Sequence, residues 1–367
     1  MALIRRTKIV LAASVVLGAL IASSGVLAQL VSAEALNPFN TLENPYRSNG
    51  QWSTLPDNRT WGSTAGVDID PDGVHLWAID RCGSNSCVGS DLPSILKIDP
   101  AGNVVKAIGG GLFLFPHGLH VDKDGNIWVT DGQGPRPNEP LRAGKGHVVI
   151  KLSPEGEVLL TLGTPGVEGN GTGPLLSEPC DVVTNDNGDI FVGDGHSGQN
   201  ANAGPDTVAR IAVFDKSGKL INSFGSWGSG RGELRTPHAL DIDSRGRLVV
   251  GDRGNNRLQI FDQQGNYLEE FTDFGRPSGI YITADDTIYV ADSESQFREG
   301  HHHPGWRHGV RVGSLREGTP KYFIRGIVGD YPDGSNPEGV AVDAAGNVFG
   351  AVVSGGGAMV RSSIPRP

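Results

Sequence analysis

The chain has 367 residues, a formal charge of −10 at pH 7, 54 glycines, 23 prolines and 20% charged residues. Its length allows one large domain or two ordinary ones, and its composition favours an all-β chain with many turns over a helical one. The acidic balance argues against nucleic acid as a partner, because phosphate backbones bind basic surfaces.

The first residues have the features of a secretory signal. A basic region at residues 5–8 precedes an apolar run from residue 9 to about residue 22, and small residues lead up to Ala28. We therefore expect residues 1–28 to be a signal peptide. The mature protein would then be exported, to the periplasm or the extracellular space, with no membrane span after cleavage. An uncleaved anchor is the alternative, although the apolar run is short for a span.

The cysteines fit an oxidising compartment. Cys82 and Cys87 are separated by Gly-Ser-Asn-Ser, a flexible stretch that permits a small disulfide loop. Cys180 is left over and is either a buried or a reactive thiol.

A hairpin pattern recurs six times along the chain. Each copy alternates apolar and polar residues over about five positions, breaks at a glycine turn and alternates again. The paired runs are 66–70 with 76–80, 118–122 with 127–131, 181–183 with 190–194, 240–243 with 248–252, 279–282 with 288–292, and 339–343 with 348–352. Third strands are visible at 95–99, 148–152, 211–215 and 258–262, and a fourth at 219–224. Four strands per repeat, roughly every 40 to 60 residues, are typical of a propeller blade.

The repeat predicts an all-β fold, a six-bladed β-propeller of one domain over residues 60–367. Residues 29–59 form an N-terminal extension. Since the sixth copy is short of strands, we expect residues 45–58 to complete it and to close the ring without an open sheet edge.

The repeat also helps to distinguish residues with a structural role, which recur in most copies, from candidates for catalysis or metal binding. An aspartate recurs at the end of the second strand in five copies, and its expected role is to cap a turn by accepting backbone N–H bonds. These residues are Asp80, Asp131, Asp194, Asp252 and Asp292.

The position just after the blade-opening proline differs between copies. It holds Ala65, His117, Cys180, His238, Ser278 and Glu338. Alternate blades of a six-bladed ring lie about 120° apart, so His117, His238 and Glu338 are expected to form a triangle around the axis. Such a triangle gives three protein ligands with an open position, as catalytic zinc requires, and it also suits Fe(II). The alternative is three polar channel residues that bind water.

Three further side chains are candidates for catalysis. Arg81 and Arg253 each follow the second-strand aspartate and can clamp a carboxylate or polarise a carbonyl from the same mouth. His196 lies two residues after Asp194 and is a candidate base near neutral pH. The alternatives are surface salt bridges for the arginines and a structural loop histidine.

Two resemblances sharpen this interpretation. The blade pattern with residues 255–262 resembles the NHL repeat family. The runs at 112–131, 237–240 and 251–257 resemble the peptidyl-α-hydroxyglycine α-amidating lyase family. That resemblance implies a six-bladed propeller in which three axial histidines hold zinc. It also implies cleavage of a C-terminal α-hydroxyglycine into a peptide amide and glyoxylate.

The resemblance makes His117 and His238 zinc ligands, and Arg81 and Arg253 active-site arginines. The third ligand falls at Glu338, where the family has histidine, and a carboxylate weakens the metal as a Lewis acid. The catalytic tyrosine of the family falls close to His196, so the base would be an imidazole. Gly339 replaces an aspartate that helps the family bind calcium, so the resemblance does not extend to calcium.

The expected function is therefore an exported, metal-dependent carbon–nitrogen lyase. It would act as a monomer on a small molecule or a peptide C-terminus, with zinc or Fe(II) as cofactor. The alternatives are a propeller hydrolase that opens small lactones with the same metal, and a non-catalytic NHL binding platform.

Overall fold

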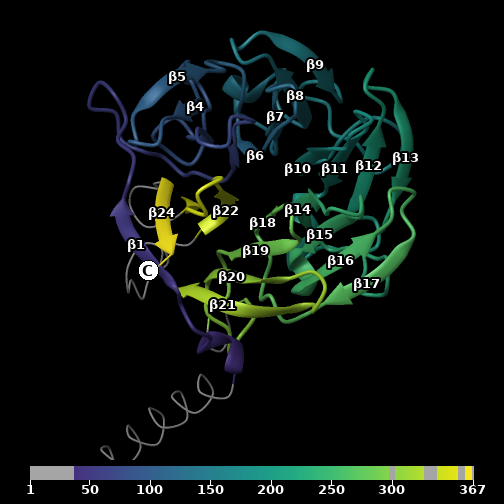
Figure 1. Ribbon diagram of the computed structural model, residues 1–367. Coiled ribbons are helices and arrows are strands. Elements are labelled where there is room, and N and C mark those ends of the chain that lie inside the picture. The colour runs from purple at the N-terminus through teal and green to yellow at the C-terminus, as the bar shows by residue number, and fades with distance from the viewer. Residues whose placement is uncertain (1–36, 297–301, 326–336, 354–359, 366–367) are drawn as a thin grey trace, which may run out of the picture.

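The computed structural model describes residues 37–296, 302–325, 337–353 and 360–365. Within these ranges the chain folds into six four-stranded antiparallel sheets that follow one another around a ring (Figure 1). The first strand of each sheet contacts the first strands of both neighbouring sheets, so these strands line the axis. The prediction of an all-β propeller is confirmed. The expected signal peptide lies outside the described residues, and no described helix is long and apolar enough to cross a membrane.

Five sheets take their strands consecutively from the chain, from the axis outward. The first three are β2 (Val67–Ile69), β3 (Leu76–Ile79), β4 (Ile95–Ile98), β5 (Val104–Ile108); β6 (Pro116–Val121), β7 (Ile127–Asp131), β8 (Val148–Leu152), β9 (Val158–Leu162); and β10 (Pro179–Thr184), β11 (Ile190–Asp194), β12 (Arg210–Phe214), β13 (Leu220–Phe224). The next two are β14 (Pro237–Ile242), β15 (Leu248–Asp252), β16 (Arg257–Phe261), β17 (Tyr267–Phe271); and β18 (Gly279–Ile282), β19 (Thr287–Asp292), β20 (Gly309–Ser314), β21 (Thr319–Arg325). All six predicted pairs of runs are strands.

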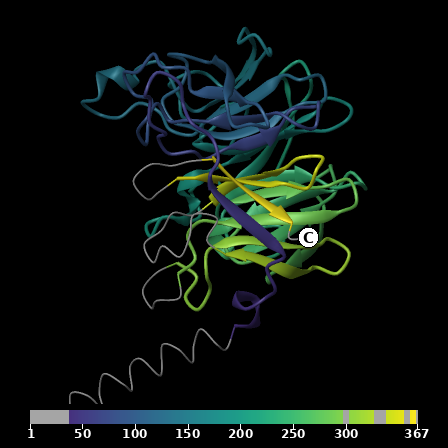
Figure 2. The ribbon, with the colours of Figure 1, turned by 60° about the vertical axis from the view of Figure 1, so that its left-hand side comes forward.

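The sixth sheet joins the two ends of the described chain. It contains β22 (Pro337–Val342), β23 (Val348–Val352), β24 (Val360–Pro365) and, outermost, β1 (Tyr46–Gln51). Strand β1 runs antiparallel to β24, with Tyr46 opposite Pro365 (Figure 2). The N-terminal extension therefore supplies a strand of the last blade, and the propeller includes residues on the N-terminal side of position 60.

The hydrophobic core lies between adjacent blades. Trp77 and Ile79 of β3 pack against Leu119 and Val121 of β6, for example. The same kind of cluster joins the first and last blades, where Val67 and its neighbours meet β22 and β23. Each large apolar side chain buried in this way contributes about 1.5–3 kcal/mol, so every blade is stabilised from both sides.

The five recurring aspartates accept backbone N–H bonds, as expected. All five side chains are fully buried. Their partners lie mainly in the segment that enters the same blade rather than in the following turn: Asp131 accepts from Leu114 and Phe115, and Asp194 accepts from Ser177. Each aspartate therefore holds in place the segment that leads into a first strand. It thereby also positions the residue of that strand that faces the axis.

Replacing Asp194 with alanine is expected to lower the free energy of unfolding by about 3–5 kcal/mol, because Arg210 would lose a buried ionic partner. In the structure Arg210 Nε lies 2.9 Å from Asp194 Oδ2. Urea unfolding at pH 7.5 measures the loss. The exposed turn residue Asp215 of the same blade is the control, and Asp215→Ala should cost much less. Equal losses for the two variants would contradict this assignment.

Candidate functional site

Three side chains from alternate blades meet on the axis. His117, His238 and Glu338 are the second residues of β6, β14 and β22, and all three are buried. In each of these strands the pairing register shifts just after the opening proline. Such a bulge redirects a side chain, and here it places the second residue of the strand on the axis.

The distances within this group are short. Glu338 Oε1 lies 3.1 Å from His117 Nε2 and 3.2 Å from His238 Nε2. The two imidazole centroids are 4.7 Å apart. The structure thus brings together the three residues that the repeat predicted as metal ligands.

Backbone carbonyls fix the tautomers of both histidines. His117 Nδ1 lies 2.8 Å from the carbonyl oxygen of Cys180, and His238 Nδ1 lies 2.6 Å from that of Ser278. A carbonyl oxygen only accepts, so both Nδ1 atoms carry the proton and donate. In a neutral imidazole the Nε2 atom then keeps its lone pair, which is the arrangement found for histidines that bind metals.

The Nε2 atoms point at another acceptor. Both are buried and face Glu338 Oε1, and an unprotonated nitrogen cannot donate to a carboxylate oxygen. Burial, reinforced by Arg253, lowers the pKa of His238 to about 3, so this ring is neutral at pH 7. Two nitrogen lone pairs and a carboxylate oxygen therefore converge on one point, where a cation would satisfy all three. The donor set suits zinc or Fe(II).

Arg81 lies beside this group and has a free donor. Its guanidinium stacks 3.6 Å from the Phe115 ring, Nε donates to the carbonyl of Pro116, and Nη1 donates to Asn85 Oδ1. Within the described residues Nη2 is buried without a partner. Burial lowers the pKa of Arg81 to about 10, so it stays charged at pH 7.

The Arg81 loop is covalently closed. Cys82 and Cys87 form the expected disulfide, with Cα atoms 5.2 Å apart, and Asn85 lies between them. Cys180 is a free, buried thiol, and burial raises its pKa well above the usual value. Of the two alternatives for this thiol, the structure favours the unreactive one.

Arg253 connects the axial group to the loops around it. It begins the 3-10 turn η4 (Arg253–Asn255). Its Nη1 lies 3.7 Å from Glu338 Oε1 and 3.7 Å from Glu294 Oε1. Arg81 and Arg253 are only 3% and 2% exposed, so neither forms the surface salt bridge that was the alternative.

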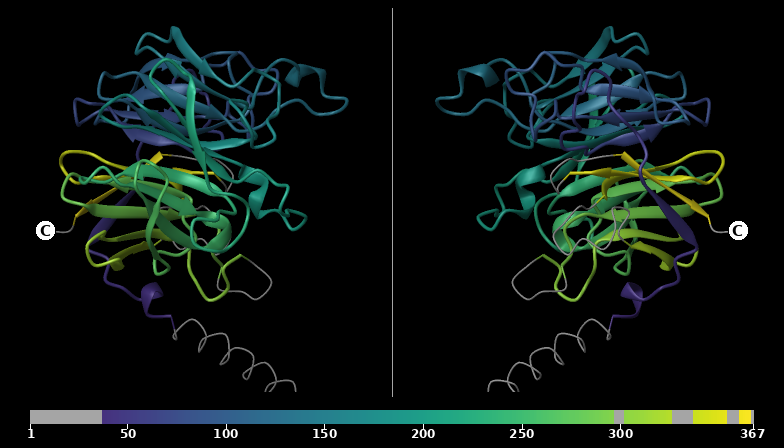
Figure 3. Two further views of the ribbon diagram at one scale, coloured as in Figure 1. Left: turned by 90° about the vertical axis from the view of Figure 1, so that its right-hand side faces the viewer. Right: turned by 90° about the vertical axis from the view of Figure 1, so that its left-hand side faces the viewer.

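His196 also reaches the axial group. It begins the 3-10 turn η3 (His196–Gln199), on the face from which the long loops project (Figure 3). Its Nε2 lies 3.1 Å from Arg253 Nη2, which donates to it. Burial, then Arg253, lower the pKa of His196 well below its usual value. The ring is therefore neutral, and the lone pair that a base would use is already occupied.

Sequence reasoning missed the groups that hold Arg253. Gln199 Oε1 accepts from Arg253 Nε and from Arg276 Nη2. Arg276 Nε lies 2.7 Å from Glu294 Oε2, and Arg276 Nη1 donates to the carbonyl of Arg253. Glu294 follows Asp292 at the offset by which His196 follows Asp194, and this shared position was the available signal.

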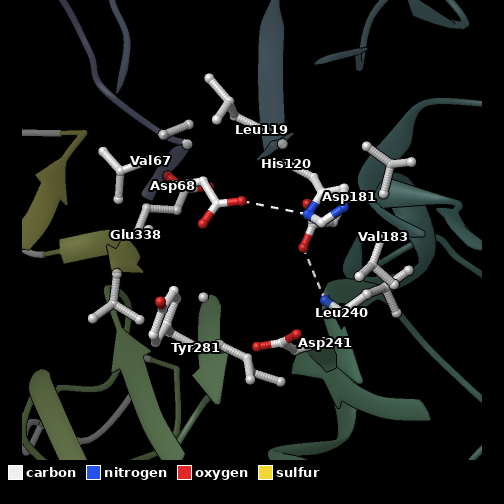
Figure 4. Close-up of a pocket in the computed structure, with 18 of the residues that line it drawn as sticks. Val67, Asp68, Leu119, His120, Asp181, Val183, Leu240, Asp241, Tyr281 and Glu338 are labelled. Atoms are coloured by element: carbon white, nitrogen blue, oxygen red, sulfur yellow. Dashed lines mark hydrogen bonds and ion pairs between the residues drawn. The ribbon is translucent and has the colours of Figure 1, made fainter. Parts of the chain in front are cut away.

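A cavity of about 270 Å³ occupies the axis on the other side of the three ligands. Its lining includes Asp68, His120, Asp181, Asp241 and Tyr281 (Figure 4). None of the three predicted catalytic side chains lines it. The axial group therefore separates this acidic cavity from the arginine-bearing loops.

The contribution of Asp181 and Asp241 to stability is expected to fall as pH rises from about 4 to about 7. Burial raises the pKa of Asp181 and of Asp241 to about 7, from 3.8. In that interval the folded state holds protons that the unfolded chain has lost, so rising pH favours unfolding. Substituting both residues by asparagine should flatten the pH dependence and raise Tm at pH 8 by several degrees. Calorimetry from pH 4 to pH 8 measures this, and an unchanged slope would contradict it.

Comparisons with known proteins agree with the fold. The NHL repeat family profile matches residues 234–261. The chain is 30% identical over 250 residues to NHL repeat-containing protein 3 of Homo sapiens. That alignment covers 65% of this chain and 64% of the human protein. It is 29% identical over 241 residues to a probable peptidyl-α-hydroxyglycine α-amidating lyase of Caenorhabditis elegans, covering 61% of each.

The matches cover less than two thirds of the length of these relatives. Among solved structures, a gluconolactonase of Xanthomonas campestris superposes with a TM-score of 0.54 and 14% identity, over 83% of this chain and 87% of that one. At that identity the likeness concerns the fold alone. The chain is therefore a β-propeller that carries an NHL repeat, and its sequence relatives include peptidyl-α-hydroxyglycine α-amidating lyases.

Proposed function

We propose that the protein is an exported, metal-dependent lyase that cleaves the carbon–nitrogen bond of an α-hydroxyglycine-type substrate. The bond between nitrogen and the hydroxyl-bearing carbon breaks, the hydroxyl proton is lost as that carbon becomes the aldehyde of glyoxylate, and a proton is delivered to the leaving amide nitrogen. The observation that carries the proposal is the convergence of two fixed imidazole lone pairs and one carboxylate beside two buried arginines.

In this proposal His117, His238 and Glu338 hold the cation. A bound divalent metal would supply Lewis-acid polarisation of a substrate oxygen. The Glu338 charge reduces that polarising power, so we expect slower turnover than a site of three neutral ligands supports.

The arginines orient the substrate. The free Nη2 of Arg81 and the Nη1 of Arg253 are donors for the carboxylate of the α-hydroxyglycine. Both guanidinium groups are buried, and a charge-assisted hydrogen bond is stronger there than in water. Proton transfer by His196 would require Arg253 to release the His196 Nε2 atom first.

Metal removal tests the proposal directly. The mature protein is expected to contain about one zinc or iron per chain, measured by elemental mass spectrometry, and to release glyoxylate from N-acyl-α-hydroxyglycines. Chelation should abolish the release, and adding the metal back should restore it. Metal-loaded protein that forms no glyoxylate would rule out this lyase activity.

A hydrolase that opens small lactones is the second candidate. It is favoured by Glu338, which differs from the histidine of the lyase family, and by the occupied lone pair of His196. A panel of lactones and small α-hydroxy acids, assayed with and without the metal, distinguishes the two. Absence of metal from the protein would instead favour a binding platform.

A further inference from the structure

Three imidazoles, not two, surround the axial point. The centroid of His196 lies 5.2 Å from that of His117 and 5.3 Å from that of His238, beside the 4.7 Å between the latter two. One nitrogen from each ring lies within 4.8 Å of the others. The rings form a nearly equilateral triangle.

The ring centroids of this triangle have the separations of a metal site. Metal–nitrogen bonds of about 2.0–2.1 Å at tetrahedral angles put ligand atoms roughly 3.3 Å apart and imidazole centroids roughly 5 Å apart. The contacts of 3.1 and 3.2 Å between Glu338 Oε1 and the two Nε2 atoms match the first distance. The three centroid separations match the second.

We propose that His196 is a third histidine ligand, so that three imidazoles and the Glu338 carboxylate hold the metal. This inference rests on the proposed function and adds a ligand from a loop of the third blade, away from the axial strand positions. It replaces the role of base that the sequence suggested for His196.

The loop that carries His196 is held in place. Gly195 has a φ of 121°, and a side chain there would meet the carbonyl of Val208, so only glycine allows the chain to turn His196 toward the axis. The His196 N–H donates to the carbonyl of Glu178. Gly198 lies against the carbonyl of Arg235, where no side chain fits, and its own carbonyl accepts from Trp227 Nε1. The ring is thus positioned before any ion arrives.

Metal binding and the Arg253 contact exclude each other at His196. If Nε2 binds the metal, its lone pair is no longer available to Arg253 Nη2. If Nδ1 binds the metal, Nε2 must carry the proton and cannot accept. In both cases Nη2 of Arg253 is released, while Nε stays on Gln199. Loading the metal therefore frees an arginine donor beside the site.

Cobalt(II) substitution tests the inference without an activity assay. Loss of a group that merely orients a ligand lowers metal affinity about 10–100-fold, so we expect His196→Ala to weaken cobalt binding by about 100-fold or more and to change the visible absorption bands. Added imidazole should restore the wild-type spectrum. His120→Ala is the matched control, because His120 lines the same channel but pairs with Asp68 and Thr184; it should bind cobalt as the wild type does.

The failures of the two proposals are distinguishable. If His196→Ala binds cobalt with wild-type affinity and spectrum, this inference is overturned and the ligands His117, His238 and Glu338 stand. If the wild type binds no metal, both proposals fail together. X-ray absorption of the zinc-loaded wild type decides the matter even if the variant does not fold, since three imidazoles support the inference and two overturn it.

Discussion

Replacing His238 with alanine is expected to remove the metal and to lower kcat/KM for glyoxylate release by about 1000-fold or more. The deletion takes away one of the two imidazoles whose buried Nε2 atoms face Glu338 Oε1 on the axis. The remaining donors would leave the cation open to exchange with water. Elemental mass spectrometry of purified wild type and variant gives the metal content, and steady-state kinetics gives the rate.

The control for this experiment is again His120→Ala, which removes a channel histidine outside the axial group. It should retain the metal and the activity. A His238→Ala variant that keeps both would exclude the axial metal site. A variant that loses the metal but keeps the activity would show that the reaction does not require the metal.

Replacing Arg81 with methionine is expected to lower kcat/KM by about 100-fold while the metal content stays unchanged. Arg81 has the one guanidinium in this group with a buried nitrogen that lacks a partner among the described residues, and a buried, charge-assisted hydrogen bond to a substrate carboxylate has a free energy of about 3 kcal/mol. Arg81→Lys should recover only part of the loss, because lysine lacks the planar fork that reaches Pro116, Asn85 and the substrate together.

A structural arginine provides the comparison for Arg81. Arg210 is also buried, but it is fully engaged by Asp194 and by backbone carbonyls. Arg210→Met should therefore lower Tm and leave kcat/KM of the folded protein unchanged. Unaltered kinetics in Arg81→Met would instead assign Arg81 a structural role like that of Arg210.

The axial group could be predicted from the sequence because the strand repeat determines which position of each blade faces the axis. Residues at one position of each first strand must face one axis, so aligning the copies was enough to place His117, His238 and Glu338 together. The third strand of the fifth blade, β20, was not found in the sequence. It begins as far after Asp292 as β8 begins after Asp131, but it reads Gly-Val-Arg-Val-Gly-Ser, so only Val310 and Val312 mark its apolar face.

The surroundings of Arg253 could not be predicted in the same way. Gln199 and Arg276 come from connections of different lengths, which have no common period, and only Glu294 shares with His196 its offset after the second-strand aspartate. The direction of a long side chain in such a segment depends on its partners in space. His196 illustrates the limit, since its offset from Asp194 placed it at the site while only the structure shows that Arg253 occupies its Nε2 atom.

The pairing of β1 with β24 has a consequence for folding. Five sheets use strands that follow one another along the chain, so each can form from local contacts. The sixth sheet needs β1 and Val360–Pro365, which lie far apart in the sequence, and until they meet β1 and the β22–β23 hairpin present unpaired backbone. We therefore expect closure of the ring to be the slow step of refolding and the one most prone to aggregation.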